Sequence, residues 1–145
     1  MKVSEILKSK GPHVYSIGED RTVRVAIDMM HRNHIGSLVI LNLSGDLTGI
    51  ITERDILELC VKYPDNFQNL IIKNVMSKQT IIAEPNDDID YIEMVMTSEF
   101  IRHVPVVENH KLVGLVSIGD VVKAQSKIIQ YENKYLRDYI NGVRG

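Results

Sequence analysis

Apolar residues recur at helical spacing behind Thr22 and again behind Asp88. The apolar positions are 23, 26, 27 and 30 in the first case and 89, 92, 95 and 96 in the second. This spacing is typical of a helix that buries one face. Thr and Asp side chains accept hydrogen bonds from first-turn N–H groups, so Thr22 and Asp88 are predicted to cap two helices. We expect these helices to end near His34 and Phe100.

A β-branched run follows each predicted helix and indicates a hairpin of two strands. The hairpins are expected at 38–51 and 104–116. A short extended piece precedes each cap, at 14–17 and at 80–82. A further helix is expected to begin in each unit, near Glu53 and near Ile118. Each unit therefore has the order strand, helix, strand, strand, helix.

The two units are copies of one pattern. A shift of 66 positions places Met30 on Met96, and a shift of 65 places the segment 49–55 on the segment 114–120, each reading Gly-x-x-[Ser/Thr]-x-x-Asp. Units this small bury too little surface to be stable alone. The sequence therefore predicts an α+β (α/β-like) fold, in which two βαββα repeats pack as a pseudo-two-fold pair. We assign residues 1–65 to the first repeat and 66–123 to the second.

A helical extension is predicted for residues 124–145. Apart from Gly119 in its first turn, no helix breaker occurs between Ile118 and Gly142, and adjacent apolar pairs recur every seven residues, at 121–122, 128–129 and 135–136. Such a stripe is expected to bury against another surface. A second copy of the chain is our first choice, which predicts a homodimer, and folding back on the repeats is the alternative.

Composition and charge narrow the classes of function. The 145 residues carry 17 basic and 19 acidic side chains and a net charge of −2, so neither nucleic acid nor a membrane is an expected partner. The apolar runs are short and the N-terminus lacks a signal sequence, so a cytoplasmic location is expected. Cys60 has no partner for an internal disulfide. The His31 and His34 pair lacks companion ligands, so no metal site is predicted. No catalytic motif is present, and neither an enzyme nor a catalytic cofactor is expected.

The duplicated pattern resembles a pair of cystathionine-β-synthase (CBS) domains. The resemblance rests on the two Gly-x-x-[Ser/Thr]-x-x-Asp segments and on residues 102–107, Arg-His-Val-Pro-Val-Val. With its tail, the chain resembles stand-alone bacterial proteins of two CBS repeats, some of them labelled as related to inosine monophosphate dehydrogenase. The resemblance implies a compact pair, often dimeric, with two clefts between the repeats that hold adenosine-containing ligands.

The resemblance also implies roles for four residues. The Asp that ends each segment holds ribose hydroxyls and the Ser or Thr three residues earlier assists, which assigns Asp55 with Thr52 and Asp120 with Ser117. A carboxylate accepts hydrogen bonds from a vicinal diol, and a helix start favours phosphate. The small residues at 49 and 114 would allow backbone or ligand to approach closely. The structural alternative is that all four residues only cap helices.

The two clefts are predicted to be unequal. In the family, the position before the central strands often faces phosphate and is basic. Here it is Arg102-His103 in the second repeat but Gly36-Ser37 in the first, where Arg54 is the candidate cation and its counterpart in the second repeat is Gly119. Pro105 supports the assignment of the strand, because it needs a position that donates no ladder hydrogen bond. The alternative for Arg102 and His103 is a solvated strand entry. The predicted binding residues are Thr52, Arg54, Asp55, Arg102, His103, Pro105, Ser117 and Asp120.

The leading hypothesis from the sequence is therefore a regulatory module that senses an adenosine-containing ligand and acts on an unidentified protein. AMP is the first expected ligand, with ATP, ADP, NAD(H) or S-adenosylmethionine as alternatives. The competing hypothesis is a structural dimerisation module with vestigial clefts. Titration with adenine nucleotides distinguishes the two, because only the first predicts saturable binding.

Overall fold

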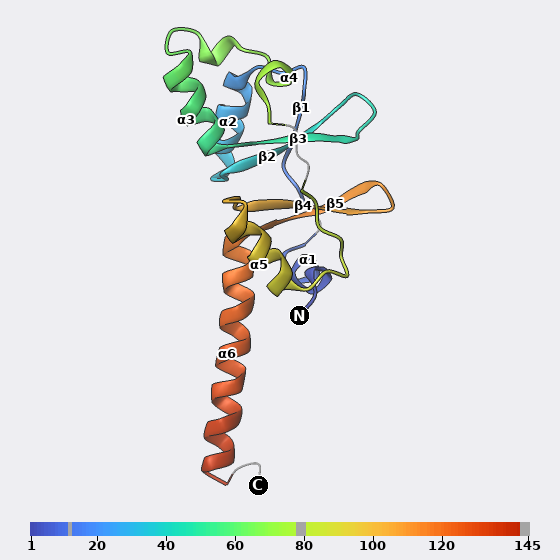
Figure 1. Cartoon of the computed structure of the whole chain (residues 1–145), viewed down its shortest axis with the longest axis vertical. Coiled ribbons are helices and arrows are strands. Elements are labelled where there is room, and N and C mark those ends of the chain that lie inside the picture. The colour runs from blue at the N-terminus through green and yellow to red at the C-terminus, as the bar shows by residue number, and fades with distance from the viewer. Residues whose placement is uncertain (12, 78–80, 143–145) are drawn as a thin grey trace.

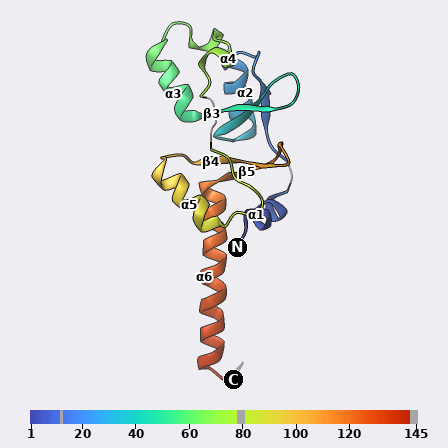
Figure 2. The same cartoon turned by 45° about the vertical axis from the view of Figure 1, so that its right-hand side comes forward.

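The computed structural model describes residues 1–11, 13–77 and 81–142. Two sheets, β1-β2-β3 and β4-β5, lie one above the other, with helices covering their outer sides (Figures 1 and 2). This arrangement confirms the predicted α+β fold of two paired repeats. The elements in chain order are α1 (Val3–Lys10), β1 (Ser16–Gly18), α2 (Val23–Asn33), β2 (Ser37–Leu41), β3 (Leu47–Thr52), α3 (Glu53–Lys62), η1 (Phe67–Asn69), α4 (Ile72–Val75), α5 (Ile89–Ser98), β4 (His103–Glu108), β5 (Lys111–Ser117) and α6 (Ile118–Ile140).

The two hairpins share their irregularities as well as their order. The antiparallel register shifts between Ile40 and Leu41 in the first hairpin and between Val106 and Val107 in the second. β1 pairs in parallel with β2, whereas among the described residues of the second half a single parallel bridge joins Ala83 to Val106. The predicted extended piece at 80–82 is thus not a strand in its described part, and Thr80 lies outside the described residues.

The equivalent helices α2 and α5 end alike but begin differently. His34 and Phe100 adopt left-handed φ angles of 53° and 55°, which confirms both predicted helix ends. The Thr22 hydroxyl accepts a hydrogen bond from the Val25 amide at 3.4 Å, as predicted. The predicted side-chain cap at Asp88 is wrong, because its carboxylate instead forms an ion pair with Lys2 at 3.0 Å.

Each half packs against a short lead segment, α1 or α4, that precedes the other half along the chain. The Val3 amide donates to Asp87 O at 2.9 Å, and the Ile72 amide donates to Arg21 O at the same distance. α1 therefore packs into the core of the second half, and α4 into that of the first. The first repeat was predicted to span residues 1–65. In space, however, residues 3–10 of that range lie with the second repeat (Figure 1).

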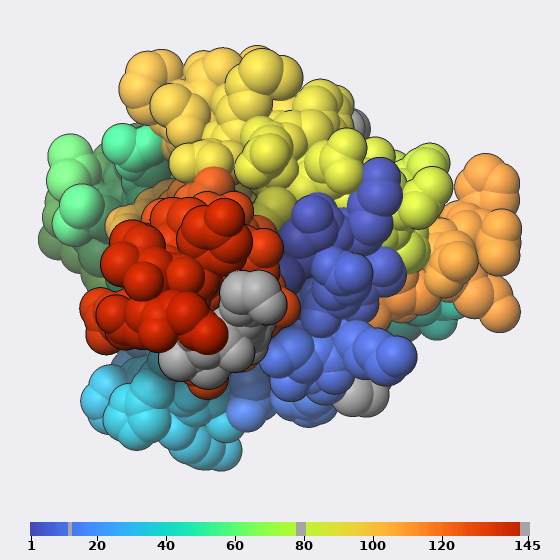
Figure 3. Space-filling view, turned by 90° about the horizontal axis from the view of Figure 1, so that it is seen from below, coloured from blue at the N-terminus to red at the C-terminus, as the bar shows by residue number. Residues whose placement is uncertain are grey.

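α6 runs through the second core and then leaves it. Val121 and Ala124 are buried, whereas Val122, Ile129 and Leu136 are 54%, 56% and 55% exposed. Viewed from below, α6 emerges between α5 and α1 (Figure 3), and its later turns extend away from both halves (Figure 1). The helix does not fold back on the repeats. Among the described residues, no helix combines the length and apolarity that crossing a bilayer requires.

Candidate functional site

The two Gly-x-x-[Ser/Thr]-x-x-Asp segments form matching capping boxes at the starts of α3 and α6. The Thr52 and Ser117 amides each donate to the Oδ2 atom of the Asp three residues later, at 2.9 Å. In return, the Asp55 and Asp120 amides donate to the hydroxyl oxygens of Thr52 and Ser117, at 3.3 and 3.1 Å. The capping role of all four residues is therefore real.

Capping leaves part of each carboxylate free. Within residues 1–11, 13–77 and 81–142, the Oδ1 atoms of Asp55 and Asp120 accept no hydrogen bond. Both side chains are only half-buried, so a ligand can reach them. Helix capping and ribose binding are thus compatible roles for the same carboxylate, since each uses a different oxygen.

Lys10 joins the second of these sites and was not predicted. Its ammonium donates to Asp120 Oδ2 at 2.7 Å and to Leu115 O at 2.8 Å. Burial of the Asp120 carboxyl raises its pKa, but hydrogen bonds from Lys10 and Ser117 outweigh burial, and the pKa lies below the ordinary value of 3.8. No local pattern indicates this contact, because Lys10 lies 110 positions from Asp120.

His103 lies where several charges from both halves meet. Burial lowers its pKa below the ordinary 6.5, and the positive charges of Arg102 and Lys10 lower it further. The negative charges of Glu53 and Asp120 oppose this shift. Because Glu53 belongs to the first half, the imidazole lies near the junction of the halves.

Hydrogen bonds to their backbone carbonyls hold Arg102 and Pro105 in position. Arg102 is exposed, and its carbonyl accepts the Ile118 amide at 2.9 Å, which fixes the strand entry beside the start of α6. Pro105 is buried in β4, and its carbonyl accepts the Ala83 amide at 2.8 Å. Because side chains alternate along a strand, Pro105 shares a face of β4 with His103.

The first site has a different charge pattern. Arg54 is exposed and forms no ion pair with a described residue. Gly36 is the counterpart of Arg102, and its carbonyl accepts a hydrogen bond from the Glu53 amide at 3.0 Å. The acidic Glu53 thus stands where the second repeat has the apolar Ile118. Residues 78–80, which follow α4 and Ser77 in the chain, lie outside the described residues.

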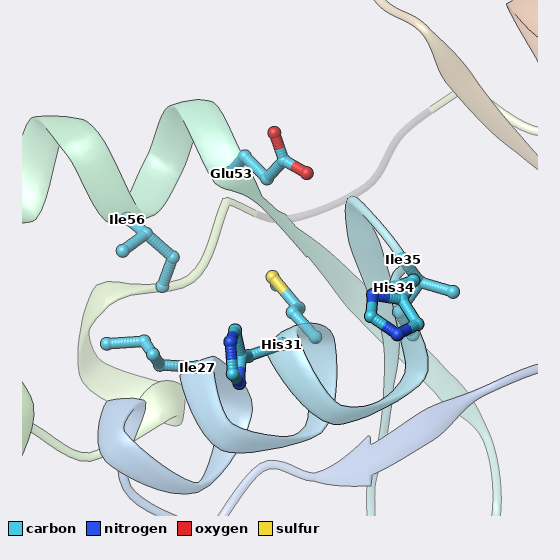
Figure 4. A pocket seen from close by; sticks show the side chains of 7 residues that line it. Ile27, His31, His34, Ile35, Glu53 and Ile56 are labelled. Carbon is cyan, nitrogen blue, oxygen red and sulfur yellow. The ribbon is translucent and has the colours of Figure 1, made fainter.

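A separate open pocket lies in the first half between α2 and α3. Its volume is about 480 Å³ (Figure 4). None of the predicted binding residues lines it, although Glu53 borders both this pocket and the surroundings of His103. The described residues contain no group of three His, Cys, Asp or Glu side chains suited to a metal ion. The lining residues are Ile27, Met30, His31, His34, Ile35, Glu53 and Ile56.

The chain belongs to the CBS domain family. The family model matches residues 3–62 and 72–127, so both repeats are recognised. Among curated relatives, the mitochondrial CBS domain-containing protein CBSX3 of Arabidopsis thaliana is 31% identical over 148 residues, covering 97% of this chain and 72% of its own. The inosine-5′-monophosphate dehydrogenase of Nitrosopumilus maritimus is 27% identical over 127 residues, which is 83% of this chain but 25% of that enzyme.

Solved structures show the same pairing of repeats. The CBS-domain protein ATU1752 from Agrobacterium tumefaciens superimposes with a TM-score of 0.83 at 34% identity, covering 86% of this chain and 92% of its own. The CBS domain pair of protein MJ0100, solved in complex with 5′-methylthioadenosine and S-adenosyl-L-methionine, gives a TM-score of 0.76 at 23% identity, covering 88% and 97% of the two chains. The protein is therefore a CBS-pair module.

Proposed function

We propose that this CBS pair is a regulatory module that binds an adenosine-containing ligand at two sites, the second site at Asp120 and the first site at Asp55. The observation that carries the proposal is the free Oδ1 atom of the half-buried Asp120, fixed at the start of a helix by its own capping box. A fixed carboxylate oxygen is suited to a ribose diol. The adenosine-containing ligands of the MJ0100 pair support this choice of ligand class.

A ligand with phosphate fits the surroundings of Asp120. Lys10, Arg102 and His103 gather there, and the first-turn amides of α6 add the positive end of a helix. AMP is our first candidate for this reason, with ATP, ADP, NAD(H) and S-adenosylmethionine as alternatives. Ligand binding would then be signalled to a regulated protein through the surfaces that the two halves expose.

Calorimetric titration with AMP tests the proposal. The unaltered protein should show saturable binding, and Asp120→Ala should weaken it by roughly 1–3 kcal/mol, the range for a lost hydrogen bond to a charged group. Asp55→Ala tests the first site in the same way. Asp46→Ala is the matched control, since this exposed carboxylate lies in the β2–β3 turn, and it should bind AMP normally. Binding that is unchanged in Asp120→Ala contradicts the assignment.

The exposed stripe of α6 supports a second candidate role in assembly. Val122, Ile129 and Leu136 follow one line of the helix, and the chain's own halves leave them half-exposed. We propose that a second copy of this chain covers the stripe, because a two-fold axis can lay identical apolar lines against each other. If no adenine nucleotide binds the unaltered protein, a purely structural dimerisation module is the better description.

A further inference from the structure

Lys10 contacts the proposed ribose carboxylate from outside both Gly-x-x-[Ser/Thr]-x-x-Asp segments. It is the last residue of α1, and Gly11, with a φ of 90°, ends the helix directly after it. α1 is anchored without Lys10, because Val3 and Ile6 are buried in the second core. The end of α1 therefore brings an ammonium group to Asp120 whose contacts are not needed to hold the helix in place.

The ammonium retains one donor. A lysine ammonium has three N–H groups, and Lys10 uses two of them, on Asp120 Oδ2 and on Leu115 O. No described residue accepts from the third. Lys10 and Asp120 together therefore present one free donor and one free acceptor, the third N–H of Lys10 and Oδ1 of Asp120.

A hydroxyl of a ribose is complementary to this pair. A hydroxyl donates one hydrogen bond and accepts others, so a single hydroxyl satisfies both groups at once. We propose that Lys10 is a specificity-determining residue of this site, which donates to a ribose hydroxyl that itself donates to Asp120 Oδ1. This inference rests on the proposed function and deepens it, because the site then selects ligands with an intact 2′,3′-diol.

The ion pair strengthens the selection. A ligand lacking one hydroxyl leaves a half-buried charged donor or acceptor without its partner, which costs more than the loss of a neutral hydrogen bond. The Lys10 and Asp120 side chains are 35% and 21% exposed, so water compensates this loss only in part.

The test is calorimetric titration of the full chain with AMP, 2′-deoxy-AMP and 3′-deoxy-AMP. Every protein carries Asp55→Ala, so that only the site at Asp120 is measured. Lys10→Met removes the donor and keeps the length of the side chain, and Lys8→Met is the control on the same helix, at an exposed residue. Lys10→Arg restores a charged donor. Thermal unfolding of each variant verifies that the fold is retained.

With Lys10 present, AMP should bind roughly tenfold more tightly than at least one of the deoxy probes, as expected for one hydrogen bond to a charged group. In Lys10→Met the affinity for AMP should fall by about tenfold. The ratio should fall as well, because only the hydrogen bond from the hydroxyl to Asp120 Oδ1 remains, whereas Lys8→Met keeps the ratio and Lys10→Arg recovers part of it. If Lys10→Met leaves the ratio unchanged, or binds AMP more tightly than the protein with Lys10, the proposed role of Lys10 is overturned while the proposed function stands. A protein that binds none of the probes, with or without Asp55→Ala, overturns the proposed function as well.

Discussion

Leu7 fills the space beside Gly114 that any larger residue there would need. A Cβ atom at Gly114 would lie 2.5 Å from Leu7 Cδ2. The first half repeats the relationship, since a Cβ at Gly49 would lie 2.8 Å from Ser77 O and 3.2 Å from Met76 Sδ. The sequence left open whether backbone or ligand approaches these glycines. The segments exchanged between the halves occupy the space at both positions.

Gly114→Ala should therefore destabilise the fold. The added methyl overlaps Leu7, and overpacking of this kind costs about 1–3 kcal/mol. Chemical denaturation measures the free energy of unfolding. Gly119→Ala is the matched control, because its Cβ would meet nothing closer than 3.6 Å and alanine favours a helix, so it should be neutral or stabilising. Adding Leu7→Ala to Gly114→Ala should reduce the effect of the glycine substitution, and strictly additive losses would contradict the overlap.

The repeats were predictable because their signals are local. The start of α3 at Glu53 and of α6 at Ile118 follows from a Ser or Thr cap with an Asp three residues later, and both helices begin there. The same pattern identified Asp55 and Asp120 as candidate binding residues. Helix ends at His34 and Phe100 were likewise predictable from where the apolar period stops.

The exchanged lead segments were not predictable in this way. Nothing near Asp88 indicates that Lys2 reaches it, so the expected side-chain cap was wrong. For the same reason Lys10 was missed as a neighbour of Asp120, since the contact depends on where α1 packs rather than on any spacing within a repeat. Long-range packing decided both cases, and a single sequence carries little information about it.

Arg102→Ala should weaken a nucleotide more than a nucleoside. Arg102 is exposed beside the start of α6, and in the proposed site it contacts phosphate rather than ribose. We expect AMP to lose about tenfold in affinity, as for one hydrogen bond to a charged group, with adenosine nearly unaffected. Arg32→Ala, at an exposed residue of α2, is the control. Equal losses for AMP and adenosine would show that Arg102 does not touch phosphate.

His103 should make the fold less stable in mild acid. Its pKa is lowered in the folded protein, first by burial and then by Arg102 and Lys10, with Glu53 and Asp120 opposing. At pH 8 the imidazole is neutral in both states, so its contribution to stability is intact. As the pH falls through about 6.5, the unfolded chain takes up a proton that the folded state resists, and stability is lost.

The measurement compares the unaltered protein with His103→Gln. The free energy of unfolding at pH 8 and at pH 5.5 gives the acid-induced loss for each, and the loss should be smaller in His103→Gln. His13→Gln serves as a control for the general effect of removing a histidine. If the acid-induced loss is the same in all three proteins, His103 does not titrate abnormally in the fold.

The exposed stripe of α6 should contribute to a dimer. Val122, Ile129 and Leu136 are each about half-exposed, and full burial of such a side chain contributes roughly 1.5–3 kcal/mol. Truncation after Lys123 would also remove Ala124, which is buried in the second core. Truncation after Gln130 is the cleaner test, because it removes the later turns of α6 and leaves that core intact.

Sedimentation equilibrium across a dilution series separates the assembly from the fold. The full chain should be dimeric at high concentration, and the chain truncated after Gln130 should dissociate at concentrations where the full chain does not. Leu136→Glu should act in the same direction, since a charge on the stripe must be desolvated in the dimer. Gln130→Glu introduces the same charge on another side of the helix and should leave the dimer intact. A full chain that stays monomeric at high concentration would contradict the proposed dimer. A Leu136→Glu variant that dimerises as well as the unaltered protein would show that the two copies do not meet along this stripe.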